Sequence, residues 1–288
     1  MRKLNVGAGP QWFKDGWEVL DNAPGRYKEK WKHRGKCWDS RLPSSTFDVL
    51  FTSHMLEHIP HFRLEKTLAE FNRLLKVGGT IRIVVPDMKR AATAYVNGDK
   101  EYFASSKRYS DDLGIGGSFL RVVISPGGQT LAISREMDEI LGGYAHLIGF
   151  DFEMLEKLLG KWGFGEIVES QAGESSIEEL RERMCLHSDG KDYPRDSEFV
   201  ESKAYLKTGK PWHYTGFDKD AKKSLYVEAK KIRSEPYSLD KELAYHKIQR
   251  FSSRLDNIKI SVIRWAMMIL DGLYWGAKRV GIRRIFNR

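Results

Sequence analysis

Apolar residues near the start of the chain form short continuous runs, separated by glycine, proline and polar residues. Runs of this length without polar alternation are typical of strands that are buried on both faces of a parallel sheet. They predict strands at residues 3–6, 17–21, 47–53 and 80–86, and a shorter strand at 37–39. A largely parallel sheet is therefore expected in the first third of the chain.

The segments around these strands show helical spacing. Leucine and phenylalanine recur on one helical face within residues 62–76, and the glycines that follow predict the end of that helix. A second amphipathic helix is predicted over 151–162, because its first residue, Asp151, is a favourable N-cap. Strands at 164–169 and 224–229 complete the pattern. Strands and helices alternating in this way predict an α/β fold.

One region interrupts the alternation. Residues 88–145 contain a helical stretch at 91–96 and glycine-rich stretches at 112–117 and 125–128, which we expect to be loops. We interpret this region as an inserted cap over the carboxyl ends of the strands.

The second half of the chain is more polar. Residues 171–220 are expected to be irregular, with a helix near 176–184, and a charged helix is expected at 240–254. We place a main domain at 1–232 and a helical extension at 233–288, which becomes amphipathic and basic from about residue 255.

The formal net charge of +9 is concentrated at the end of the chain. From residue 259 onward there are seven Lys or Arg residues and one acid, Asp271, so the body is nearly neutral. A neutral body does not favour nucleic-acid binding. The tail 255–288 is too charged to span a bilayer but suits a helix lying on an anionic membrane surface. The alternative is a helix packed on the domain or on a second subunit of a homo-oligomer.

Cys37 and Cys185 are the only cysteines, too few and too far apart for a disulfide framework or a cysteine metal cluster. The chain begins directly with a predicted strand, and no apolar run is long enough to be a membrane-spanning helix. We therefore expect a cytoplasmic location, with the tail as the candidate for contact with the inner face of the membrane.

Small and polar residues end or follow four of the predicted strands. Gly7 and Gly9 form a G-x-G turn, where the missing Cβ lets the backbone approach a ligand. Asp21 ends the next strand, and a carboxylate there can accept hydrogen bonds from two ribose hydroxyls. The other two strands are followed by Ser53, His54 and Asp87. Because parallel strands end at one edge of a sheet, these residues are expected to lie together.

The ordered set of segments resembles the class I S-adenosylmethionine-dependent methyltransferases, and most of all the compact bacterial branch of their type 11 group. The segments are LNVGAGP, VLD, WDSRLP, FDVLFTSHMLEHIP and FNRLLKVGGTIRIVVPD. The resemblance covers residues 3–88 well and residues 146–170 and 222–231 moderately. It implies a Rossmann-like sheet, mostly parallel with an antiparallel last strand, and S-adenosyl-L-methionine as cofactor.

The resemblance also implies a role for each matching residue. Gly7 and Gly9 would face the methionine half of the cofactor, and Asp21 would hold the ribose hydroxyls. Asp39 would accept from the adenine amino group, and the remaining contacts would be Trp38 or Leu42 against the ring, with Ser53 and His54 near the sulfonium. The sequence departs from the fuller family pattern in two ways: Asn5 replaces an acid, and only about ten residues join the first two strands.

Three histidines and a glutamate follow the strand at 47–53: His54, Glu57, His58 and His61. The first interpretation is a cofactor wall with a general base, since imidazole titrates near neutral pH. The second is a set of packing and capping residues. The third is a metal site, but the H-x-x-E-H spacing needs a further ligand that the sequence does not indicate, so no metal is expected. The candidates for a catalytic base are His54, His146 and Asp87.

The expected function is methyl transfer to a hydroxyl or amine of a sugar or small metabolite, in the context of cell-envelope polysaccharide biosynthesis. The expected partner is a small-molecule or glycan acceptor, without nucleic acid. One alternative is a non-catalytic protein that uses the methyltransferase fold for binding or scaffolding, and another is an RNA methyltransferase. A nicotinamide enzyme is disfavoured, because the third glycine of G-x-G-x-x-G is absent and Asp21 comes too early.

Overall fold

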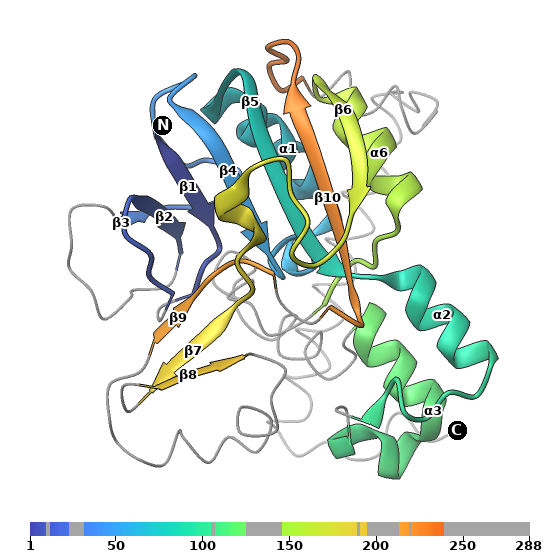
Figure 1. Cartoon of the computed structure of the whole chain (residues 1–288). Coiled ribbons are helices and arrows are strands. Elements are labelled where there is room, and N and C mark those ends of the chain that lie inside the picture. The colour runs from blue at the N-terminus through green and yellow to red at the C-terminus, as the bar shows by residue number, and fades with distance from the viewer. Residues whose placement is uncertain are drawn as a thin grey trace, which may run out of the picture. The chain divides into compact units, whose positions relative to one another are not determined.

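A computed structural model describes residues 1–9, 12–22, 32–104, 107–124, 146–188, 191–194, 213–218 and 221–238 (Figure 1). The described elements belong to one compact unit, Met1–Tyr237. The expected loop at 125–128, the expected helix at 240–254 and the tail 255–288 lie outside the described residues. Among the described helices, none is long and apolar enough to cross a membrane.

A seven-stranded sheet forms the centre of the unit, with the strand order β3-β2-β1-β4-β5-β10-β6. Strands β3, β2, β1, β4 and β5 pair in parallel, whereas β10 is antiparallel to both of its neighbours. The mostly parallel sheet with an antiparallel last strand is therefore confirmed. The strands are β1 (Lys3–Val6), β2 (Trp17–Asp21), β3 (Lys32–Arg34), β4 (Phe47–Ser53), β5 (Leu75–Pro86), β6 (Phe164–Ser170) and β10 (Ser224–Lys231).

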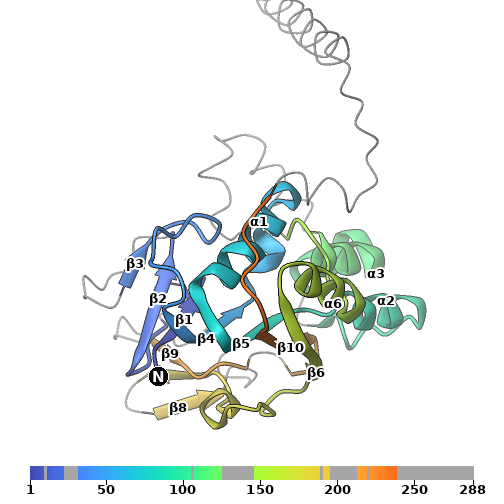
Figure 2. The same ribbon diagram turned by 90° about the horizontal axis from the view of Figure 1, so that it is seen from above.

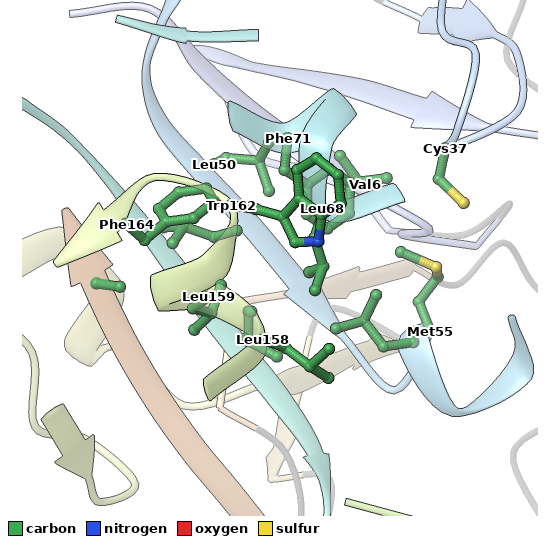
Figure 3. Close-up of a cluster of buried hydrophobic side chains, with 14 of the residues drawn as sticks. Val6, Cys37, Leu50, Met55, Leu68, Phe71, Leu158, Leu159, Trp162 and Phe164 are labelled. Atoms are coloured by element: carbon green, nitrogen blue, oxygen red, sulfur yellow. The ribbon is translucent and has the colours of Figure 1, made fainter. Parts of the chain in front are cut away.

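Helices α1 (His61–Leu74) and α6 (Phe152–Lys161) cover one face of this sheet (Figure 2). As predicted, Asp151 caps α6, and its Oδ1 accepts a hydrogen bond from the Met154 N–H at 2.9 Å. Trp162, at the end of α6, is fully buried between the helices and the sheet (Figure 3). Its Nε1 donates to the buried Glu65 of α1 at 3.0 Å, so the largest side chain of this core is also hydrogen-bonded.

Described residues of the 171–218 segment, which was expected to be irregular apart from one helix, pack on the opposite face of the sheet. In place of the helix expected near 176–184, the chain forms a short 3₁₀ turn, η3 (Glu178–Arg181). The segment also forms a small antiparallel sheet of β7 (Cys185–Ser188), β8 (Lys191–Pro194) and β9 (His213–Thr215) (Figure 1). The expectation of an irregular segment with one helix near 176–184 was therefore wrong on both points.

Aromatic side chains join this segment to the sheet. Trp12, in the short connection between β1 and β2, is fully buried, and its Nε1 donates to the Gly216 carbonyl at 2.7 Å. The rings of Trp17 and Phe217 lie 4.7 Å apart, and the ring of Phe51 lies 4.9 Å from that of Phe217. The described residues of the β1–β2 connection form no helix, so these aromatic side chains cover this part of the sheet.

A fully buried arginine, Arg82 on β5, ties the same segment to the sheet. Its guanidinium donates two hydrogen bonds to the carboxylate of Asp218, at 2.9 and 2.7 Å, and one to Glu228 of β10 at 2.8 Å. It also donates to the backbone carbonyl of Gln171 at 3.0 Å. Arg82 thus connects β5, β10 and both ends of the 171–218 segment.

Three other boundaries differ from expectation. The strand expected at 37–39 lies earlier, at β3, and Cys37 and Trp38 occupy a turn that a bridge between Lys36 and Asp39 closes. They are buried in the core without being part of the sheet, which explains why their apolar character suggested a strand. The helix expected over 62–76 ends at residue 74, and β5 begins immediately after it, running through the glycines that were expected to stop the helix.

The predicted cap region begins with helix α2 (Met88–Val96), close to the expected helix at 91–96. The glycine-rich stretch 112–117 is not a loop, because it lies inside α3 (Lys107–Val123), which is kinked at Gly114, where φ is 63°. Helix α2 follows β5 directly, and α3 packs beside it at the carboxyl end of that strand (Figure 1).

Candidate active site

The carboxyl ends of the parallel strands meet at one edge of the sheet. The register aligns Val6 of β1 with Leu20 of β2 on one side and with Thr52 of β4 on the other. Ser53 of β4 aligns with Val84 of β5. The predicted site residues that end or directly follow these strands are therefore gathered at this edge: Gly7, Asp21, Ser53, His54 and Asp87.

The two glycines of the first turn have the same backbone conformation but different surroundings. Gly7 and Gly9 have φ values of 73° and 76°, a region that only glycine adopts readily. A Cβ on Gly7 would lie 2.2 Å from Cγ of Met55, whereas a Cβ on Gly9 would meet no described atom within 4 Å. Gly7 thus packs against the protein, and Gly9 is the glycine whose backbone a ligand can approach.

This difference predicts unequal effects of substitution at the two glycines. Gly7→Ala is expected to lower the thermal stability clearly more than Gly9→Ala, because both pay the cost of a positive φ but only Gly7→Ala also forces Met55 to move. Thermal unfolding of both variants beside the wild type measures the difference. Equal losses would mean that Met55 does not fix the position of the turn.

Asp21 is directly connected to the glycine turn. Its Oδ2 accepts a hydrogen bond from the Gly9 N–H at 2.8 Å, and the Gly7 N–H donates to the Leu20 carbonyl at 2.8 Å. The end of β2 therefore holds the turn after β1 in place. The ribose role of Asp21 remains a prediction, to which the structure adds a role in shaping the turn.

The predicted adenine contacts lie on the turn after β3. Trp38 is buried in the main core, with Lys36 Nζ and Arg63 Cζ at 5.6 and 5.7 Å from its ring centre. Asp39 is exposed beside it, and Leu42 is partly buried against the same core. Trp38 is thus a core residue in the described structure, and its contact with the adenine ring remains a prediction.

His54 links three elements at the end of β4. Its φ of 50° is unusual for a residue with a side chain and costs about 1–3 kcal/mol, a strain that is common at functional sites. Its Nε2 lies 2.9 Å from the Ser224 hydroxyl of β10, and its Nδ1 lies 3.3 Å from Oε1 of Glu57. The imidazole is thus oriented by contacts from both of its nitrogens.

Asp87, the third candidate base, is held by its own helix. Its Oδ1 accepts from the Arg90 N–H at 3.0 Å as the N-cap of α2, and its Oδ2 pairs with Arg90 Nε at 2.9 Å. Both carboxylate oxygens are engaged and the residue is buried, which favours the capping interpretation over a role as base.

The structure brings together a group that the sequence left incomplete. Glu57 and His58 lie on the 3₁₀ turn η1 (Leu56–His58), and the ring of His146 lies 5.0 Å from that of His58. His146 reaches this position because the Leu147 N–H donates to the Glu57 carbonyl at 2.6 Å. The sequence grouped Glu57 with His58 and offered His146 separately, but no local pattern indicated that a residue so far along the chain would meet η1.

Glu57 is the buried acid of this group, with only 1% of its surface exposed. Burial alone raises the pKa of a carboxyl group, but the imidazoles of His54, His58 and His146 outweigh burial and hold the pKa of Glu57 at about 2. The group therefore combines an ionised carboxylate with three imidazoles at the carboxyl edge of the sheet.

The residues at this edge fit a polar nucleoside cofactor. The hydroxyl oxygen of Ser53 is buried without a hydrogen-bond partner among the described residues, as expected where a ligand supplies the partner. The backbone of Gly9 has space beside it for a ligand, and the Asp21 carboxylate is hydrogen-bonded to the Gly9 N–H. Ser53, Gly9 and Asp21 would thus hold S-adenosyl-L-methionine at the end of β1, β2 and β4.

Comparison with known proteins gives one family match. The family described as "Methyltransferase domain" matches residues 18–83, which run from β2 to β5. No curated protein sequence matches the chain.

Three of the solved structures with a similar chain trace are described as methyltransferases. A SAM-dependent methyltransferase from Archaeoglobus fulgidus is 16% identical, with a TM-score of 0.39 over 80% of this chain and 86% of that one. A SAM-dependent methyltransferase from Methanosarcina mazei is 14% identical, with a TM-score of 0.39 over 80% and 92% of the two chains. An N-methyltransferase of Haemonchus contortus, solved with S-adenosylhomocysteine, is 13% identical, with a TM-score of 0.38 over 81% and 49%.

Proposed function

We propose that the chain is a class I S-adenosylmethionine-dependent methyltransferase and that it methylates a hydroxyl or amine of a sugar or another small metabolite. The observation that carries the proposal is that Gly9, Asp21, Ser53 and His54 all lie at the same edge of the sheet, where the parallel strands end. This edge combines groups suited to a nucleoside cofactor with a group that can accept a proton.

The bound cofactor supplies an activated methyl group, so the protein's main task is to hold the acceptor atom in line with it. As the acceptor oxygen or nitrogen bonds to the methyl carbon, the carbon–sulfur bond breaks and the acceptor loses its proton. A hydroxyl or amine acceptor is therefore helped by a nearby base. His54 suits this role better than Asp87, because its Nε2 faces the Ser224 hydroxyl, which can donate to it, whereas Arg90 engages both oxygens of the aspartate.

A cell-envelope acceptor is part of the same proposal. The two helices α2 and α3 stand at the carboxyl end of β5, beside the proposed reaction site, and offer a surface for an acceptor larger than the cofactor. The location we propose is the cytoplasm, at the inner face of the membrane, where lipid-linked glycans are assembled.

Transfer of labelled methyl tests this function directly. The full-length protein is incubated with S-adenosylmethionine carrying a radiolabelled methyl group and with nucleotide sugars, lipid-linked sugars, small amines or RNA. We expect label in a sugar or amine acceptor, and none with the Asp21→Ala variant. Label in RNA would contradict the acceptor class. Tight cofactor binding without transfer to any acceptor would favour the non-catalytic alternative.

The basic tail gives a separate prediction about location. Full-length protein is expected to sediment with vesicles that contain anionic lipid, and a variant lacking residues 256–288 is expected to remain in solution. The reason is that each Lys or Arg near an anionic surface contributes about 1 kcal/mol, and seven lie from residue 259 onward. Zwitterionic vesicles are the control. If the full-length protein ignores anionic vesicles, the tail packs on protein instead.

A further inference from the structure

Two segments far apart in sequence are joined where η1 meets the start of the described 146–188 stretch. The Leu147 N–H donates to the Glu57 carbonyl at 2.6 Å, and the Ile148 N–H lies 3.3 Å from the same oxygen. These backbone contacts place His146 beside Glu57 and His58. The arrangement is therefore fixed by the backbone on both sides.

Glu57, His58 and His146 each direct one ligand atom toward the others. One carboxylate oxygen and one nitrogen from each ring all lie within 4.8 Å of one another, and Glu57 Oε1 is 3.9 Å from His58 Nε2. Neither carboxylate oxygen of Glu57 accepts a hydrogen bond from the described residues, although the side chain is almost fully buried. A buried carboxylate that accepts no hydrogen bond is a position where a bound cation is a favourable partner.

The ring of His146 is oriented for binding a cation. Its Nδ1 lies 2.7 Å from the backbone carbonyl of Val122, and because a carbonyl can only accept, Nδ1 is the protonated nitrogen. In the neutral ring, Nε2 then carries the lone pair. Histidines that bind metals characteristically hold their second nitrogen in this way, by a hydrogen bond to a carbonyl or carboxylate.

We propose that Glu57, His58 and His146 bind a divalent transition-metal ion of the zinc type. Two imidazoles and one carboxylate are a ligand set that suits such ions, whereas magnesium and calcium prefer oxygen ligands alone. Within the H-x-x-E-H segment, Glu57 and His58 lacked a third ligand in the sequence; the fold supplies it in His146 rather than in His54. The inference does not depend on which acceptor the protein methylates.

The ligand atoms of Glu57, His58 and His146 need to move only a little to bind an ion. Metal–ligand distances of about 2.0–2.2 Å place the ligand atoms of a tetrahedral site about 3.4 Å apart, so the present arrangement must contract by about 1 Å. Three protein ligands leave at least one position for water or another molecule, as in open metal sites. His54, with Nδ1 at 3.3 Å from Glu57 Oε1, is placed to orient the carboxylate from outside the ligand set.

The experiment measures metal binding by the full-length protein, freed of metal by a chelator and then dialysed. Calorimetric titration with Zn²⁺ in the presence of a weak competing chelator gives the affinity of the protein for Zn²⁺. Elemental analysis after gel filtration gives the number of zinc ions bound per chain. Co²⁺ added in place of Zn²⁺ reports through its visible absorption whether nitrogen ligands surround the ion. The variants are His58→Ala, His146→Ala and Glu57→Gln, with His61→Ala as the matched control, since His61 is an exposed histidine outside the group.

We expect about one Zn²⁺ per chain in the wild type and in His61→Ala, and an affinity reduced about 100-fold or more in His58→Ala and His146→Ala. Glu57→Gln removes the negative charge but keeps the size of the side chain, so it should also weaken Zn²⁺ binding. Circular dichroism checks that this variant is folded. Wild-type protein that retains no Zn²⁺, or His146→Ala protein that binds it as tightly as wild type, would overturn the proposal.

Discussion

Replacing Arg82 by alanine is expected to lower the free energy of unfolding by about 3–5 kcal/mol, the largest stability loss that the structure suggests for one side chain. Arg82 is fully buried, and its guanidinium is the shared partner of Asp218 and Glu228. Without it, two buried carboxylates face each other with no cation between them. Chemical denaturation monitored by circular dichroism measures the loss.

The matched control for Arg82 is an ion pair on the surface of the same sheet. Lys230 of β10 pairs with Glu166 of β6, and both side chains face solvent. Lys230→Ala is expected to change the free energy of unfolding by less than about 1 kcal/mol. If both variants lose similar amounts of unfolding free energy, burial of the ion pair does not determine the loss. In that case Arg82 does not hold the 171–218 segment on the sheet.

The largest functional effect is expected from Asp21→Ala, which should abolish cofactor binding while leaving the fold intact. Asp21 accepts from the Gly9 N–H at 2.8 Å and ends β2, so its loss removes both the carboxylate for the ribose and the support of the glycine turn. Calorimetric titration with S-adenosylhomocysteine measures the affinity, and thermal unfolding checks the fold.

Asp48→Ala serves as the control for Asp21. Asp48 lies at the start of β4, on the opposite edge of the sheet, where it bonds to the Arg2 N–H and to Lys76. Its removal is expected to leave the affinity for S-adenosylhomocysteine unchanged. If Asp21→Ala binds the ligand as well as Asp48→Ala does, Asp21 does not belong to the cofactor site.

The central sheet was predictable because its strands are buried on both faces. Continuous apolar runs identified β1, β2, β4 and β5, and their order gave the parallel arrangement. β3 was missed because Lys32, His33 and Arg34 carry no apolar signal. β3 is the edge strand of the sheet, where charged residues are usual because only one side pairs.

The gathering of Gly9 and Asp21 at one edge of the sheet could be predicted, whereas the contacts between distant segments could not. Gly9 follows β1 and Asp21 ends β2, and because these parallel strands end together, chain order alone placed the two residues near each other. His146 meets Glu57 through backbone hydrogen bonds of a loop, and Trp12 meets Phe217 across most of the chain. Such contacts depend on tertiary packing that has no local period in the sequence, which is why the 171–218 segment appeared irregular.

Binding of S-adenosylhomocysteine to the wild-type protein is the most direct test of the methyltransferase assignment and of the site at the ends of β1, β2 and β4. The folded full-length protein is titrated with the ligand in a calorimeter, and its thermal unfolding is followed with and without the ligand. The site predicts saturable binding of about one ligand per chain and a higher unfolding temperature when the ligand is bound. A well-folded sample that shows neither heat of binding nor a shift in unfolding temperature would contradict the assignment.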